Sequence, residues 1–126
     1  MQNAISLSVA ALIAVAVTVI GTFYLASPKR VTGSFGLKLP SPDADTRAWL
    51  RLKGIRDVGC GLVVLILMLT ADRRSLGIAL LALAVIPFGD MSIVLGSGGS
   101  RLSAFSIHGL TCAVMVVVGL SLIHAI

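Results

Sequence analysis

The amino-acid sequence predicts an all-α protein, a four-helix transmembrane bundle with one long cytoplasmic loop. Hydrophobic residues make up 57% of the 126 residues and charged residues only 12%, against about one quarter charged in ordinary soluble domains. The apolar residues form long continuous runs instead of the short alternating segments of a membrane β-barrel. Four of these runs approach the roughly 20 residues that a helix needs to cross a bilayer.

These four runs leave little of the chain outside the membrane, so we expect residues 1–126 to form a single membrane domain. The first run is followed, not preceded, by basic residues, which is the reverse of a secretory signal, and we expect it to be retained. The connection "DRR" is short enough to join the second and third helices as an antiparallel hairpin. The helices are expected at about residues 4–26, 54–71, 75–95 and 103–125.

The long loop between the first two helices leads into a helix start. Three of the four prolines lie in this loop, which disfavours a continuous helix through it. Asp43 or Asp45 before "TRAWLRLKGIRD" indicates a helix start, so we expect an interfacial extension of the second helix. Trp49 should then lie at the depth of the lipid headgroups, with Arg51 and Lys53 reaching anionic lipid.

The basic residues predict the orientation in the membrane, because cytoplasmic flanks collect Lys and Arg. Two of them, Arg73 and Arg74, fall on one side of the expected bundle and eight on the other. We therefore expect an integral protein of the plasma (inner) membrane with both termini outside. These residues flank membrane segments and no soluble domain is expected, so nucleic acid is excluded as a partner. The eight are Lys29, Arg30, Lys38, Arg47, Arg51, Lys53, Arg56 and Arg101.

Several polar residues are expected at one depth in the cytoplasmic leaflet. Counting about 1.5 Å per residue from the membrane boundary places Asp57, Asp90 and His108 at similar depth on three helices. Ionisable groups inside membrane helices are costly and are candidates for function. We expect these three to form one acid–base site, with Arg56 paired to a carboxylate and Tyr24 at the rim. Two carboxylates in a poorly solvated site would repel, which favours one as a protonated acid and the other as a base.

Each of these residues also has a structural interpretation. Tyr24 can anchor at the membrane interface, and Arg56 can extend to lipid phosphates. Asp57 can pair with Lys53, four residues earlier on the same helix. His108 can form a hydrogen bond to a neighbouring helix. The polar residues come singly, without the spacing of a metal site, so we expect no metal and no cofactor. The candidate catalytic residues are Asp57, Asp90 and His108, and the candidate substrate-binding residues are Tyr24, Lys53, Arg56 and Trp49.

Other features bear on the same region. The loop segment "SFGLKLP" alternates Phe35, Leu37 and Leu39, and we expect it to lie against the cytoplasmic face and partly cover the polar cluster. Pro87 removes a helix hydrogen bond to the carbonyl of Leu83, close to Asp90.

Glycines of the second, third and fourth helices are expected to permit close helix approach. They are Gly54, Gly59, Gly61, Gly77, Gly89 and Gly109. Cys60 and Cys112 are expected to be two buried thiols.

With "FGLKLP", "KGIRD", "IPFGD" and "HG" located, the chain resembles a family of small four-helix integral membrane proteins of bacteria and fungi that has no assigned function. In that family a loop like "FGL.LP" precedes a helix opening with "KGIRD", and an acidic residue late in helix three is followed by a His early in helix four. The resemblance covers about residues 20–115. In size and helix number the chain is also similar to DoxX-like membrane proteins, some of which partner quinone-linked oxidoreductases, although no motif residue matches them. The family resemblance implies the fold and the importance of Lys53, Arg56, Asp57, Asp90 and His108, but no reaction.

The polar cluster predicts a site that binds a lipid or another amphiphilic small molecule and can transform it by isomerisation, cyclisation or epoxide opening. Two alternatives remain. Intramembrane Asp residues and Pro87 also suit a proton-coupled transporter subunit, which with four helices would need a homo-oligomer. The glycines and the basic loop also suit a structural or partner-binding subunit of a membrane complex. The sequence leaves open whether the protein is an enzyme.

Overall fold

The computed structural model describes residues 2–38 and 43–123, with side chains from residue 4 onward. This part of the chain is helical almost throughout and contains no strand, which confirms the all-α prediction. A 3₁₀ turn covers Thr32–Phe35 and a π-helix covers Ala104–Gly109. The α-helices are α1 (Gln2–Ala26), α2 (Pro28–Val31), α3 (Ala44–Thr70), α4 (Arg73–Leu83), α5 (Val85–Gly96), α6 (Arg101–Ser103) and α7 (Leu110–Leu122).

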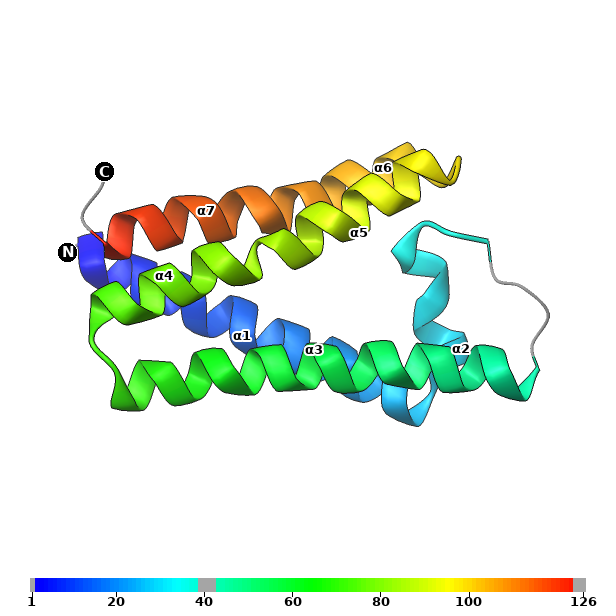
Figure 1. Cartoon of the computed structure of the whole chain (residues 1–126), viewed down its shortest axis with the longest axis horizontal. Helices are drawn as coiled ribbons and strands as arrows, with labels where there is room; N and C mark the ends of the chain where they lie inside the picture. Colours follow the sequence, from blue (N-terminus) through cyan, green and yellow to red (C-terminus); the bar gives the residue numbers. More distant parts are fainter. Residues whose placement is uncertain (1, 39–42, 124–126) are drawn as a thin grey trace.

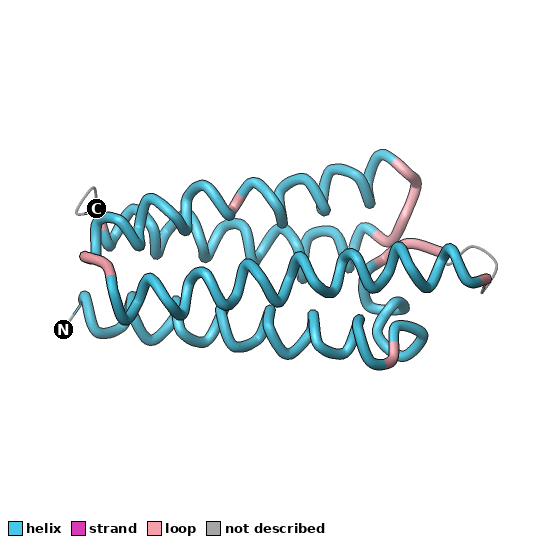
Figure 2. Tube along the Cα trace, turned by 60° about the horizontal axis from the view of Figure 1, so that its bottom comes forward, coloured by secondary structure: helices cyan, strands magenta, loops and turns pink. Residues whose placement is uncertain are grey.

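The long helices run side by side along one axis (Figures 1 and 2). The start of α1, the end of α7 and the connection between α3 and α4 lie at one end of the molecule, and α2 and α6 lie at the other. In the described residues, three stretches are long and apolar enough to cross a membrane: Ala4–Ala26, Arg73–Gly96 and Arg101–Leu122. Such helices are typical of a membrane protein. The apolar half of α3 is not among them, since it carries Lys53, Arg56 and Asp57.

Glycines bring the helices together in pairs. A Cβ on Gly54 of α3 would lie 2.7 Å from the carbonyl oxygen of Gly21 of α1, and a Cβ on Gly77 of α4 would lie 2.7 Å from that of Gly119 of α7. Only glycine permits backbones to approach this closely. The expected close approach is therefore found at Gly54 and Gly77. At Gly59 the prediction is wrong, because nothing lies within 4 Å of an added Cβ.

Gly61 also lies in a close contact, while Gly89 does not. A Cβ on Gly61 would lie 2.7 Å from the carbonyl oxygen of Ala14, and one on Gly89 would meet nothing within 4 Å. Gly89 was thus wrongly predicted to permit close packing; it lies on a side of α5 that no described helix covers.

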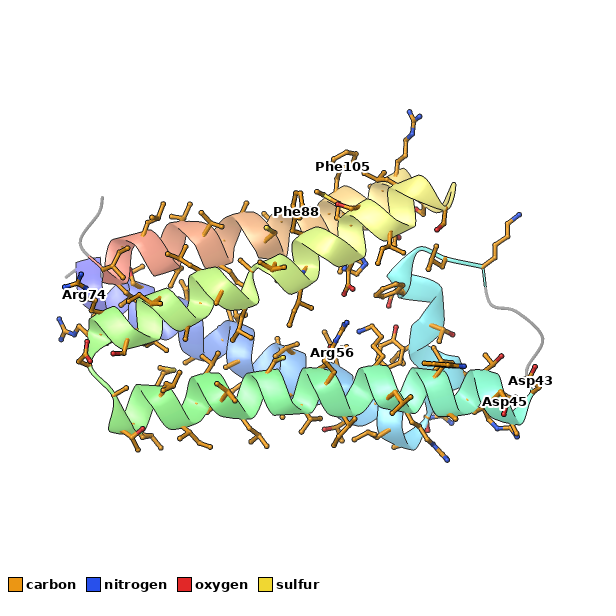
Figure 3. The ribbon with its side chains drawn as sticks, in the orientation of Figure 1. Asp43, Asp45, Arg56, Arg74, Phe88 and Phe105 are labelled. Atoms are coloured by element: carbon orange, nitrogen blue, oxygen red, sulfur yellow. The ribbon has the colours of Figure 1, made fainter. Side chains whose placement is uncertain are left out.

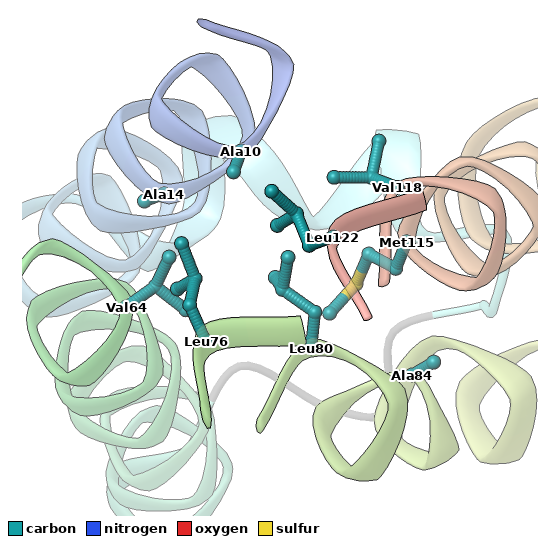
Figure 4. Close-up of a cluster of buried hydrophobic side chains, with 9 residues drawn as sticks. All are labelled: Ala10, Ala14, Val64, Leu76, Leu80, Ala84, Met115, Val118 and Leu122. Atoms are coloured by element: carbon teal, nitrogen blue, oxygen red, sulfur yellow. The ribbon is translucent and has the colours of Figure 1, made fainter. Parts of the chain in front are cut away.

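Buried apolar side chains fill the half of the molecule nearer the termini. Leu76 and Leu80 of α4 and Leu122 of α7 are almost fully buried at the centre of this core (Figure 4). Because helices α1, α3, α4 and α7 all contribute, the core holds the two glycine-linked pairs together at this end. The full cluster is Ala10, Ala14, Val64, Leu76, Leu80, Ala84, Met115, Val118 and Leu122.

The second helix begins at Ala44, directly after Asp43, one of the two residues expected to mark the start of its interfacial extension, and ten residues before the expected apolar segment 54–71. The Asp43 carboxylate accepts a hydrogen bond from the backbone N–H of Thr46 at 2.7 Å, which caps the helix and holds the pKa of Asp43 below its ordinary value. The helix then runs without a break to Thr70, so the expected interfacial extension and the expected apolar segment are one continuous helix. Asp72 caps α4 in the same way, through Ser75, and its pKa is lowered as well.

The third expected helix is divided at Ala84 into α4 and α5. Ala84 lies three residues before Pro87, which has no N–H to donate to the carbonyl of Leu83. The division therefore occurs where the sequence removes a hydrogen bond, just before the turn of α5 that carries Asp90.

Candidate functional site

Four charged side chains form a network between α3 and α5. Lys53 and Arg56 both donate to the carboxylate of Asp57, and the distance from Arg56 Nη2 to Asp57 Oδ1 is 3.1 Å. The same Arg56 Nη2 lies 3.3 Å from Asp90 Oδ2 on α5. In Figure 3 the Arg56 side chain extends from α3 toward α5. Arg56 therefore joins the two carboxylates that the sequence placed at equal depth.

Helical spacing explains why α3 supplies three of the four groups. Residues three and four apart share a face of a helix, which places Lys53, Arg56 and Asp57 together. The Asp57 side chain is only 6% exposed and that of Asp90 15%, whereas that of Arg56 is 41% exposed. Two cations thus balance two carboxylates, as buried charge requires, while one cation stays accessible.

Two aromatic rings surround the ammonium group of Lys53. Lys53 Nζ lies 4.5 Å from the centre of the Tyr24 ring and 5.1 Å from that of Phe35, both within the range of cation–π attraction. Tyr24 is buried rather than at an exposed rim, and its hydroxyl lies 3.5 Å from the carbonyl oxygen of Val31. The end of α1 and the following loop therefore form one wall of the network.

His108 is buried next to this wall but bonds to the backbone instead of to a carboxylate. Its Nε2 lies 3.1 Å from the carbonyl oxygen of Phe35, and since a carbonyl can only accept, Nε2 carries the proton. The His108 and Phe35 rings meet edge to face, 4.6 Å between centres. His108 lies in the π-helix Ala104–Gly109, a wider turn that is frequent at functional sites.

Phe35 is the residue that links His108 to the ion pairs. It lies at the end of the 3₁₀ turn, and Gly36 follows it with a φ of 99°, a conformation that favours glycine. The Gly36 carbonyl accepts a hydrogen bond of 2.8 Å from the backbone N–H of Ser100 before α6. The contacts of Phe35 with Lys53 and His108 agree with the expected cover over the cluster at this residue. Leu37 is half-buried, and Leu39 lies outside the described residues.

The comparison with protein families gives a clear result for this chain. The model of a family described as "Domain of unknown function (DUF4267)" matches residues 14–122. The chain belongs to this family. The expectation of an uncharacterised family is thereby confirmed, while "KGIRD" as its signature and the likeness to DoxX proteins stay predictions. Comparisons with curated proteins and with solved structures give no match to this DUF4267 chain.

The structure of the DUF4267 chain brings together most of the predicted site residues. Direct contacts join five of them, which are Tyr24, Lys53, Arg56, Asp57 and Asp90. His108 is linked to them through Phe35, which the sequence predicted as part of a cover. The signal for Phe35 was its place in an alternating apolar segment of an otherwise polar loop.

Trp49 lies apart from the network of this DUF4267 chain. It precedes Arg56 by about two helical turns and is 72% exposed, as an interfacial anchor would be. Its contact with a substrate stays a prediction.

The described residues contain no group of three or more His, Cys, Asp or Glu side chains that could hold a metal ion. Cys60 and Cys112 are free and half-buried within that part of the chain.

Proposed function

We propose that this DUF4267 protein is a four-helix transmembrane bundle that binds an amphiphilic small molecule at the Lys53–Arg56–Asp57–Asp90 network. The observation that supports this most is the exposure of the Arg56 side chain, which is 41%, against 6% for the side chain of Asp57 and 15% for that of Asp90. A polar head can exchange hydrogen bonds with Arg56 and Asp90 there. The apolar tail would lie along the surrounding helices, whose outer surfaces carry many exposed large hydrophobic residues.

The orientation forms part of the proposal. The loop at residues 27–53 faces the cytoplasm, both termini lie outside, and the protein resides in the plasma (inner) membrane. Eight basic residues against two support this orientation. The binding site then opens in the cytoplasmic leaflet.

Proton transfer to the bound molecule would extend the binding function. Asp90 is the best placed acid or base, because its carboxylate has Arg56 as its partner, whereas Asp57 is held by two cations. His108 would act as a hydrogen-bond donor near the head of the ligand. Isomerisation, cyclisation and epoxide opening are reactions that such groups can catalyse.

The test is what stays bound after extraction in mild detergent. Native mass spectrometry and analysis of the extracted small molecules should find one class of amphiphile on the wild-type protein, and much less of it on Arg56→Gln. Arg101→Gln, which removes an exposed arginine of α6 that takes no part in the network, is the matched control and should retain the ligand. Equal retention by Arg56→Gln and the control, with both variants folded, would contradict the binding site.

The balanced charges favour a second candidate, a structural or partner-binding subunit. Two cations and two carboxylates that satisfy one another can serve only to join α3 to α5. Replacing Arg56 and Asp90 together by Met and Leu should then preserve both folding and assembly with the partner. Under the binding function the same variant should fold but lose the amphiphile.

A further inference from the structure

A second candidate site lies on the other side of α3, away from the ion-pair network. There a groove of ≈ 550 Å³ separates the end of α1 from the first half of α3. Its lining includes Leu25 of α1, and Arg47, Arg51, Leu52 and Ile55 of α3. Each helical residue turns the side chain by about 100°, so these residues of α3 lie roughly opposite the face that carries the network.

The groove combines cations with an apolar floor. Arg47 and Arg51 lie four residues apart and therefore on one side of α3. Leu25 provides apolar surface from α1, and both Leu52 and Ile55 are more than half exposed. Cations therefore lie toward the start of α3, and apolar side chains toward its membrane half.

The guanidinium of Arg51 is held in position over the end of α1. Its Nε donates to the carbonyl oxygen of Leu25 at 3.3 Å, and this bond uses one of its five N–H donors. Arg47 also interacts electrostatically with Asp43, which makes Arg51 the principal cation of the groove. A planar guanidinium with several donors matches the oxygens of a phosphate.

We propose that this groove binds an anionic phospholipid, with its phosphate against Arg51 and Arg47 and an acyl chain along Leu52 and Ile55. The complementary charge selects the headgroup, and the apolar residues favour a lipid over a soluble phosphate. This site is separate from the amphiphile site at the network and does not depend on it. The lipid would join the end of α1 to the start of α3.

The experiment uses the full chain in mild detergent, with phosphatidylglycerol or phosphatidylcholine added, and counts bound lipids by native mass spectrometry. The wild-type protein should prefer phosphatidylglycerol. In the Arg47→Gln, Arg51→Gln double variant this preference should fall by about tenfold or more, because each arginine near an anionic headgroup contributes about one kcal/mol. Leu52→Ala with Ile55→Ala should lower the binding of phosphatidylglycerol as well.

The matched control is Lys29→Gln with Arg30→Gln. It removes the same charge from the same end of the molecule, but these exposed residues do not line the groove. The control should keep the preference for phosphatidylglycerol. An equal loss in both double variants would show general attraction to the basic surface and overturn the proposal. Inorganic phosphate that displaces phosphatidylglycerol at equal concentration would overturn it too, as would an unchanged preference in folded Arg47→Gln, Arg51→Gln protein.

Discussion

Replacing Gly54 by Ala should weaken the contact between α1 and α3 beside the charged network. An added Cβ would lie 2.7 Å from the Gly21 carbonyl oxygen, 2.9 Å from the Tyr24 Cβ and 3.0 Å from the Leu25 backbone nitrogen. None of these atoms can rotate away, so the two helices must separate. Gly59→Ala is the matched control, because it makes the same change on the same helix with nothing within 4 Å.

The difference between the two variants gives the packing cost. Replacing glycine by alanine inside a helix contributes about 1 kcal/mol in favour of the helix, and this contribution is common to both. Overpacking costs typically about 1–3 kcal/mol, and rigid backbone neighbours place Gly54→Ala toward the upper end. We therefore expect Gly54→Ala to be less stable than Gly59→Ala by about 2–3 kcal/mol. Gly21→Ala, the reciprocal change, should behave like Gly54→Ala, since its Cβ would lie 2.7 Å from the Gly54 carbonyl oxygen.

The free energy of unfolding should be measured for each variant in the same bilayer-like detergent mixture, by steric trapping or by denaturant titration. Values for Gly54→Ala and Gly59→Ala within about 0.5 kcal/mol of each other, the scatter of ordinary surface substitutions, would refute the close backbone contact. The two helices would then have to pack differently around Tyr24 and Lys53.

Three further predictions concern pH, ion pairing and topology. The pKa of Asp43 is held below its ordinary 3.8 by the backbone N–H that it caps, so its stabilising effect is present above that value and lost as the pH falls through the lower folded-state pKa. The protection of the amides in the first turn of α3, which is their exchange relative to the intrinsic rate at each pH, should therefore fall in acid, and Asp43→Asn, which caps without titrating, should remove this fall. A double-mutant cycle of Arg56→Gln and Asp90→Asn should give a coupling of about 0.5–1 kcal/mol, modest because Arg56 is partly exposed, and strictly additive effects would exclude the ion pair. In intact cells, with the native cysteines replaced, an impermeant thiol reagent should label Arg74→Cys and not Ser34→Cys; the reverse pattern would invert the proposed orientation.

The helices were predictable because run length and capping are local properties. The apolar runs located α1 closely, and they located the helical stretch 101–122 that α6, the π-helix and α7 form together. Asp43 or Asp45 was expected before the start of α3, and Asp43 is the residue that caps it. Pro87 was expected to remove a hydrogen bond, and the helix is divided beside it at Ala84. The π-helix at Ala104–Gly109 was not predictable. Its residues, AFSIHG, carry no local pattern that distinguishes a π-helix from an α-helix. His108 within it contacts Phe35, which lies 73 positions away in the chain.

Within the site, residue counting could bring side chains to one level along the helices, but it could not give the direction in which each side chain points. Counting residues along each helix placed Asp57, Asp90 and His108 at one level, and the structure joins the first two through Arg56. The rotation of each helix about its axis depends on tertiary packing, so the sequence could not show that His108 faces the Phe35 carbonyl. The same limit applies to Gly59 and Gly89. Both were expected at helix contacts because they are glycines, but a Cβ added at either position would meet nothing within 4 Å.

The ion pair between Arg56 and Asp90 joins residues 34 positions apart, which has a consequence for biogenesis. During synthesis α3 leaves the ribosome before α5, so Arg56 reaches the insertion machinery before its partner on α5 has emerged from the ribosome. Asp57 already has Lys53 on its own helix, which leaves the charge of Arg56 to be balanced later. In the proposed four-helix arrangement, α3 would thus enter the bilayer at a cost that Asp90 later lowers. Stable insertion of α3 would then depend on the arrival of α4 and α5. The helix α3 and the α4–α5 segment would be integrated together as a hairpin.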